Sequence, residues 1–488
     1  MEILIILLSF SLAALTAITV RNKRIIELSS LIASFVGLVT SVLIAVKVSS
    51  AGGSYASFQF FFVDGLSAIV MLIVAFVGFG ATVYSIAYLR QETAKNIIGL
   101  SNVSKITSRI REYFILLNLF MVSIFLAIVA NSPILAWIFI EATTLSTAFL
   151  ISFYNKPSAM EAAWKYLIVN SVGILLAFLG TLLYFTSFHT GMENGIITWQ
   201  MLTNNATLLN PMIVKIAFVF ILIGYGTKVG FAPMHTWKPD AYSKAPAPIG
   251  ALFSGALMPA AFMLILKFKI ITDSVAGTSF SQTLFIIFGL LSILIAATII
   301  FVARNYKRVL AYSSIENAGI MALGFGFGGL GIFAAILHMI YHSLIKSALF
   351  FLSGNILLKY SSAKISNVKG AISVIPITAI LFFTGFFIIT GAPPFGIFFT
   401  KIVIFSAIVK TNLWVAAVGV ALTIILFVGF FKHITSMVFG EKPADIKNGE
   451  DSVWLILPPL VFMALALYLS FNLPPFLNNL INYVVLHY

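Results

Sequence analysis

The sequence predicts an all-α polytopic membrane protein with about fourteen transmembrane helices. The chain has 488 residues, of which 60% are hydrophobic and only 9% are charged, whereas about a quarter of the residues in soluble domains are charged. Apolar runs of about twenty residues, the length at which a helix crosses the bilayer core, recur from one end of the chain to the other. These runs are too long and continuous for an outer-membrane barrel, whose strands alternate over about ten residues.

The expected spans follow one another with basic residues between every second pair. By residue number they are, approximately, 3–20, 26–48, 64–88, 112–130, 133–154, 161–187, 211–229 with a broken extension, 247–267, 281–302, 308–327, 330–358 (broken), 372–410 (broken), 413–437 and 453–471. Most of the 29 Lys and Arg residues fall in the odd-numbered loops, Lys238 and Lys244 among them. The positive-inside rule therefore places these loops in the cytoplasm and both termini outside. The first span lacks a basic leading region, so we expect it to be retained as a span of the cell membrane.

Two interrupted helices five spans apart indicate an internal repeat. Gly230 and Pro233 break the seventh span, and Gly391, Pro393 and Pro394 break the twelfth. A shift by five spans reverses the direction of crossing, so spans 4–8 and 9–13 are expected to form two inverted repeats, and such matched breaks point to an ion site in transporters. The expected organisation is 1–110 for the first three helices and a basic cytoplasmic loop, 111–270 and 271–440 for the two repeats, and 441–488 for the last helix and a tail.

Four lysines fall within predicted spans, namely Lys165, Lys228, Lys346 and Lys401. Each charge near the bilayer centre costs about 2.5–3.5 kcal/mol on insertion scales, so intramembrane lysines indicate function. Glu161 precedes Lys165 by four residues, which leaves a local ion pair as an equal alternative to a place in a proton relay. Lys401 has snorkelling to an interface as its alternative, but its predicted position well inside a span argues against this.

Glu141 is the one charged residue between Phe114 and Phe153. An acid at lipid depth stays ionised only when a base lies nearby, and we expect that base to be Lys228. A structural ion pair and a neutral, hydrogen-bonded acid remain open alternatives.

His338, His342 and Lys346 are spaced by four residues and share one helix face. Imidazole titrates near neutrality and can pass protons. A two-histidine metal site lacks an evident third ligand, so no metal is expected, and a structural polar seam stays open. The histidines also share one helix, so they do not form the facing pair that holds haem.

The remaining features limit the class of function. Asp64, Asp240 and Glu316 lie near predicted span ends and are interpreted as solvated. The chain contains no cysteine, which excludes disulfides and thiolate-bound iron–sulfur clusters in this chain. Buried titratable groups spread over several spans indicate a proton or cation pathway and do not fit an enzyme with a soluble substrate.

Six motifs carry a resemblance to a known family. They are EATTLSTAF at 141–149, EAAWKYLIVNSVG at 161–173, GYGTKVGFAPMHTWKPDAYSKAPAPIGALFSG at 224–255, KRVLAYSSIENAGIMALG at 307–324, HSLIKSALFFLSGNI at 342–356 and GAPPFGIFFTK at 391–401. Together they resemble the antiporter-like family, which comprises the large pumping subunits of respiratory complex I, the large Mrp sodium/proton antiporter subunits and their relatives in membrane-bound hydrogenases. EATTL, EAAWKYL, SSIE and GAPPFG look most like the component F branch of hydrogenase-4 and formate hydrogenlyase-type complexes.

The resemblance implies a role for each candidate residue. Glu141 would be the span-5 acid paired with Lys228; His338, His342 and Lys346 would continue a polar axis; Lys401 would serve the second half-channel; and Lys165 matches the lysine of the sixth span. One departure concerns span 8, where many relatives carry Lys or His. Ser254 and Pro259 stand here instead, and Lys267 comes only near the helix end.

The implied function is that of a non-catalytic subunit, translocating H⁺ or Na⁺, in a redox-driven hydrogenase complex. The implied partners are other membrane subunits, including other antiporter-like ones, and the lipid bilayer, with no nucleic acid. Iron–sulfur clusters and a NiFe site would belong to partner subunits. The alternatives are a subunit of an Mrp-type antiporter or of a complex I-type NADH/quinone oxidoreductase and, in another class, a mainly structural membrane arm.

Overall fold

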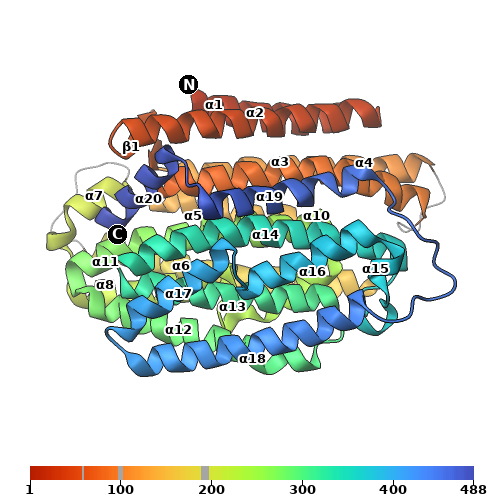
Figure 1. The fold of residues 1–488 in the computed structure, drawn as a ribbon. Coiled ribbons are helices and arrows are strands. Elements are labelled where there is room, and N and C mark those ends of the chain that lie inside the picture. Colours follow the sequence, from red (N-terminus) through yellow and green to blue (C-terminus); the bar gives the residue numbers. More distant parts are fainter. Residues whose placement is uncertain (58–59, 97–102, 188–196) are drawn as a thin grey trace.

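The computed structural model describes residues 1–57, 60–96, 103–187 and 197–488, most of them helical. Figure 1 shows long helices packed side by side along a common direction. Within the described residues, twelve helices are long and apolar enough to cross a membrane, which confirms the predicted class of an all-α polytopic membrane protein. Large apolar side chains such as Leu12, Trp164 and Leu175 are exposed on the outside of the bundle, as a surface that faces lipid or a partner protein requires.

The N-terminal part begins with two helices joined by a short turn and continues through a small hairpin into a third helix. Its elements are α1 (Glu2–Thr19), α2 (Lys23–Ser50), β1 (Ser54–Ser57), β2 (Phe61–Asp64) and α3 (Gly65–Ala94). The strands are antiparallel, with Ser54 opposite Asp64. Asp64 then caps α3, because its Oδ1 accepts a hydrogen bond of 2.7 Å from the backbone N–H of Ser67.

The middle part contains the first of the two predicted helix breaks. Its elements are α4 (Val103–Val129), α5 (Pro133–Ile151), α6 (Pro157–Thr186), α7 (Trp199–Asn204), η1 (Ala206–Leu208), α8 (Pro211–Val229), η2 (Met234–Thr236), α9 (Trp237–Lys244), α10 (Ala247–Leu252), η3 (Phe253–Leu257) and α11 (Met258–Ala276). Asn210 caps α8 by accepting from the N–H groups of Met212 and Ile213. Gly230 ends it in the left-handed region at φ +85°, so the predicted break is present. The π-helical η3 divides the eighth span at a place where no break was expected.

The next part contains the second break. Its elements are α12 (Thr278–Ile299), η4 (Ile300–Val302), α13 (Tyr306–Phe327), α14 (Leu330–Tyr360), η5 (Ile365–Asn367), α15 (Ala371–Val374), α16 (Pro376–Thr390), α17 (Gly396–Val409) and α18 (Leu413–Val438). Gly391, at φ +90°, ends α16 as predicted. The expected break in the span at 330–358 is wrong, because α14 is continuous over 31 residues. Gly328 and Gly329, both at positive φ, instead turn the chain between α13 and α14.

α14 forms the centre of the molecule, packed against α3, α10, α13, α16, α17 and α19 (Figure 1). The C-terminal elements are η6 (Val453–Leu455), α19 (Leu457–Phe471) and α20 (Pro475–His487). The expected tail is thus largely helical, and α20 folds back onto α2 and α3. Both termini lie at one end of the bundle, since Glu2 pairs with Lys47 at the end of α2 and Tyr488 donates to Asp64.

Candidate functional site

The first group of charged residues lies where α8 breaks. Lys228, in the last turn of α8, is buried and donates to the Thr144 hydroxyl at 2.6 Å. That hydroxyl donates to Glu141 Oε2 at 2.7 Å, and Ser171 of α6 donates to Oε1 at 3.1 Å. The phenol oxygen of Tyr166 lies 3.4 Å from Lys228 Nζ. The structure therefore joins Glu141 and Lys228 through one hydroxyl group, not through a direct ion pair.

The local backbone suits a cation at this point. The C-terminus of a helix carries a partial negative charge, which favours an ammonium in the last turn. Thr144 was not among the predicted site residues, although the sequence contained a signal for it. In the EATT motif, the hydroxyl three residues after Glu141 lies on the same helix face as the acid.

A second group lies on α14, as the spacing of four predicts. His338 exchanges hydrogen bonds of 2.9 Å with Thr400 of α17 through Nδ1 and with Asn317 of α13 through Nε2. Lys346 donates to the backbone carbonyl of Leu310. Both ring nitrogens of His342 are buried and have no hydrogen-bond partner among the described residues. His342 is therefore a polar group with unused bonding capacity inside the bundle.

The third group lies where α16 and α17 meet. Lys401 of α17 forms an ion pair of 2.8 Å with Glu316 Oε1 and also donates to the Thr390 carbonyl at 3.0 Å. Glu316 is 1% exposed and sits in the middle of α13, so its interpretation as a solvated group is wrong. Its Oε2 accepts from Asn317, which also contacts His338. The ion pair is thereby connected to the polar face of α14.

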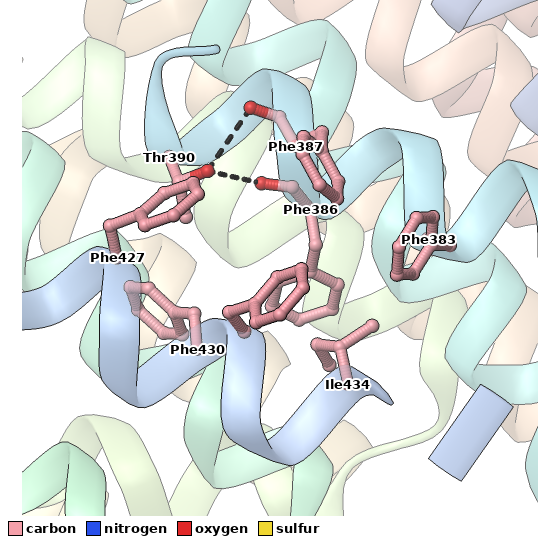
Figure 2. A pocket seen from close by; sticks show the side chains of 8 residues that line it. Phe383, Phe386, Phe387, Thr390, Phe427, Phe430 and Ile434 are labelled. Atoms are coloured by element: carbon pink, nitrogen blue, oxygen red, sulfur yellow. Dashed lines mark hydrogen bonds between the residues drawn. The ribbon is translucent and has the colours of Figure 1, made fainter. Parts of the chain in front are cut away.

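An aromatic layer covers the end of α16 beside this ion pair. Figure 2 shows Thr390 among phenylalanines of α16 and α18. The Thr390 hydroxyl donates to the carbonyls of Phe386 and Phe387, one turn earlier. Because α16 ends at Thr390, the backbone carbonyl of Thr390 has no later turn of helix to bond and accepts from Lys401, while the aromatic rings supply an apolar wall around the break.

Lys165 lies apart from these groups. Its side chain is 50% exposed and pairs with Glu161 at 2.6 Å and with Asp240 at 3.3 Å. The local ion pair that the sequence left open is therefore present. Asp240, interpreted as solvated, is partly exposed and also pairs with Arg308.

Two lysines occupy places that the sequence did not predict. Lys238, expected in a cytoplasmic loop, is 0% exposed and donates to the Val229 carbonyl at 2.7 Å; the loop assignment is wrong because the short helix α9 turns back into the bundle. Lys267 pairs with Asp64 at 2.6 Å, so Asp64 is not solvated either. Burial alone raises the pKa of Asp64, but the Lys267 ammonium and the Ser67 amide outweigh burial and hold that pKa below its ordinary value.

The part of the eighth span before Lys267 contains a serine hydroxyl but no Lys or His. Ser254, in the π-helical η3, shares a hydrogen bond of 2.8 Å with Ser314 of α13. No cluster of three or more His, Cys, Asp or Glu side chains in the described part of the chain is placed to hold a metal ion. The titratable groups thus lie beside the break after α8, on α14 and beside the break after α16.

Comparisons with known proteins agree with this arrangement. Residues 130–426 match the family described as NADH:quinone oxidoreductase/Mrp antiporter, TM, and residues 49–96 match the family described as NADH-ubiquinone oxidoreductase (complex I), chain 5 N-terminus. The hydrogenase-4 component F homolog of Methylacidiphilum infernorum is 35% identical over 430 residues, which is 87% of each chain.

Two solved structures have the same fold. A chain of the membrane-bound sulfane sulfur reductase, an archaeal respiratory membrane complex, has a TM-score of 0.86 at 23% identity and covers 100% of this chain and 96% of its own. A chain of the Mrp complex from Dietzia sp. DQ12-45-1b has a TM-score of 0.85 at 18% identity and covers 99% and 96%. The chain therefore belongs to the NADH:quinone oxidoreductase/Mrp antiporter family of transmembrane proteins, the antiporter-like family that its motifs resemble.

Proposed function

We propose that the protein translocates H⁺ or Na⁺ as the antiporter-like subunit of a redox-driven membrane complex. The observation that carries this proposal is the row of buried and partly buried ionisable groups that lies beside two helix breaks and on α14. Glu141 and Lys228 lie beside the first break, and Glu316 and Lys401 lie beside the second. Between them runs the polar face of α14. Intramembrane ionisable groups of this kind mark ion pathways by default.

The helix contacts support the two inverted repeats, which remain part of the proposal. α4 packs on α5 as α12 packs on α13, α5 packs on α6 as α13 packs on α14, and α8 packs on α11 as α16 packs on α18. Fourteen crossings follow if α13 and the broken pair α16–α17 each cross once beside the twelve long apolar helices. The basic loops then lie in the cytoplasm and both termini outside.

Electrostatic coupling between the acid and the lysine supplies the mechanism. When the charge on Lys228 changes, the energy that holds Glu141 through Thr144 changes with it. Glu141 itself is only partly buried, and α5 exposes Ile138, Leu145 and Phe149 on the outside of the bundle. A neighbouring subunit on this face would bring its own charges close to Glu141. In this proposal, Lys165 is an ion-paired group at the half-exposed edge of the bundle.

We further propose the hydrogenase branch of the family. The supporting observation is the 35% identity to a protein named hydrogenase-4 component F homolog. In such a complex the iron–sulfur clusters and the NiFe site would lie in partner subunits, and this chain would contribute no catalytic residue. A nickel-hydrogenase large subunit among the co-purifying proteins would support this assignment.

A second candidate function is that of an antiporter subunit without a redox module. The observation in its favour is the TM-score of 0.85 to a chain of an Mrp complex. Expression of the chain alone in an antiporter-deficient host separates the two, because a subunit of a redox complex should be inert by itself.

The main test uses the intact complex reconstituted in vesicles, with pumping and redox turnover measured together. Glu141→Gln and Lys228→Ala should each lower the ions moved per redox turnover by about tenfold or more, a bound set below the effect of about 10²–10⁴-fold on rate that a proton-transfer group typically has. Lys215→Ala is the matched control, since Lys215 lies in the same helix α8, near its start. Normal pumping by either site variant would contradict the proposal, and wild-type coupling after Lys401→Ala would favour a structural membrane arm.

A further inference from the structure

The two helix breaks share a local arrangement that identifies an additional residue. Gly230 and Gly391 both end a helix in the left-handed region, and each is followed three residues later by a proline. After each break a lysine returns from the next helix. Lys401 Nζ donates to the carbonyl of the residue just before Gly391, at 3.0 Å. Lys238 Nζ donates to the carbonyl just before Gly230, at 2.7 Å.

The glycines make room for these lysine side chains. A Cβ atom on Gly230 would lie 2.6 Å from Lys238 Cδ, and one on Gly391 would lie 2.9 Å from Lys401 Cδ. Both contacts are closer than real Cβ atoms show, so a side chain at either glycine would displace the lysine from its present position. Lys238 of α9 thus has the same place relative to the break at Gly230 that Lys401 of α17 has relative to the break at Gly391.

The surroundings of Lys238 differ from those of Lys401 in one respect. Lys401 has Glu316 as its counter-ion, whereas no carboxylate of the described residues pairs with Lys238. Its remaining contacts are the Met258 sulfur at 3.7 Å and the Tyr242 ring, 5.6 Å from the ring centre. A fully buried ammonium with so few partners is costly. A purely structural role is therefore a poor account of this lysine.

The position of Lys238 bridges a gap in the buried row. From Ala247 to Leu266 the chain carries no ionisable side chain, and Met258, which Lys238 contacts, lies in that stretch. On one side, Lys238 binds the carbonyl of Val229, the neighbour of Lys228. On the other side, α14, which carries His342 and Lys346, packs against η3, the segment directly before Met258, and the charge of Lys238 acts on both residues.

We propose that Lys238 is a proton-carrying residue of the first half-channel, equivalent to Lys401, and that it links Lys228 to His342 and Lys346. The proposal rests on the proposed function. Each transfer moves one proton and its charge from one nitrogen to the next, so that Lys238 becomes an ammonium as Lys228 becomes neutral. The proton then passes to Lys346 or to an unused ring nitrogen of His342.

The decisive variant is Lys238→Gln in the reconstituted complex. The Gln amide can still donate to the Val229 carbonyl but cannot carry a proton, so it separates transfer from mere support of the helix end. We expect normal amounts of complex and a drop in ions moved per redox turnover of about tenfold or more. Lys244→Gln, the same change on the same helix at a partly exposed lysine, should pump like the wild type.

A second variant tests the inference even if the complex with Lys238→Gln does not assemble. Lys238→His keeps a titratable group whose ordinary pKa is about 6.5, compared with about 10.4 for lysine. The pumping optimum of this variant should therefore move to lower pH by about one unit or more. The titratable groups that interact with the position are His235 before α9, Tyr242 on α9, and His342 and Lys346 on α14, and they are unchanged in both proteins.

The outcomes distinguish this inference from the proposed function. The role of Lys238 alone would be overturned by normal pumping in Lys238→Gln, or by an unchanged pH optimum in Lys238→His, if Lys228→Ala still loses pumping. Normal pumping in Lys228→Ala as well would overturn the proposed function itself.

Discussion

The ion pair between Glu316 and Lys401 should stabilise the protein far more than a pair of the same chemistry at the surface. Its atoms are 2.8 Å apart and both side chains are buried. Coulomb's law at an effective dielectric constant of about 20 gives an upper limit of ~6 kcal/mol for this separation. Removal of one partner of a buried pair typically costs about 3–5 kcal/mol, because the other charge is left uncompensated.

A double-mutant cycle tests this magnitude. Glu316→Gln and Lys401→Met should each lower the free energy of unfolding by about 3–5 kcal/mol. The double variant should cost less than the sum, by about 3 kcal/mol, because it leaves no buried charge without a partner. The free energies can be measured by denaturant titration of the protein in lipid micelles, followed by tryptophan fluorescence.

The chain offers a matched control for the same chemistry. Glu161 and Lys165 also form a Glu–Lys pair, at 2.6 Å, but both side chains are at least half exposed. Water screens such a pair, so Glu161→Gln should leave the free energy of unfolding nearly unchanged. Equal effects of Glu161→Gln and Glu316→Gln, or strict additivity in the cycle, would refute the argument that burial makes the second pair strong.

Two further predictions concern other contacts. Thr144→Val removes the hydroxyl that joins Glu141 to Lys228 and should lower pumping by about tenfold or more, whereas Thr144→Ser should pump normally; equal pumping by both would show that the bridge is dispensable. Asp64→Asn should cost about 2 kcal/mol at pH 7, since it removes a charged partner of Lys267 and of the α3 cap. Because the pKa of Asp64 is lowered in the folded state, its stabilisation is complete above the ordinary aspartate pKa of about 4 and is lost as the pH falls through the lowered pKa. Unfolding free energies of variant and wild type should thus converge in acid; a constant difference would exclude the electrostatic explanation.

The long helices could be predicted from the sequence because apolar length alone determines them. The break at Gly230 was equally predictable, since glycine followed by proline both permits and requires a helix end. The break expected in α14 was wrong for a related reason. A glycine cluster close to a polar span was interpreted as an interruption of that span, but the cluster instead forms the turn before it.

Two charged site residues that the sequence analysis missed, Lys238 and Glu316, show why charges cannot be placed from the sequence pattern alone. Lys238 was assigned to a loop because the positive-inside rule assumes that basic residues between spans are in water. A short helix such as α9, which turns back into the protein, contradicts that assumption without any hydrophobic signature of its own. Glu316 was assigned to a span end, although it lies about three turns into α13, whose N-terminal residues include Lys307 and Arg308. In both cases the tertiary contacts, and not the local pattern, bury the charge.

In the proposed function, the balance of charge in the interior would make the row respond to a neighbouring subunit. Two carboxylates face four lysines in it, namely Glu141 and Glu316 against Lys228, Lys238, Lys346 and Lys401. Full charging of all four lysines would leave two ammonium groups without counter-ions in a medium that penalises unpaired charge by several kcal/mol each. The row is therefore most stable with fewer protons than it has sites, and a charge brought to Glu141 from outside changes which lysine holds them. Lys238 and Lys346, which form no ion pair with a carboxylate of the described residues and instead donate to backbone carbonyls, are the sites that such a redistribution should fill or empty most easily.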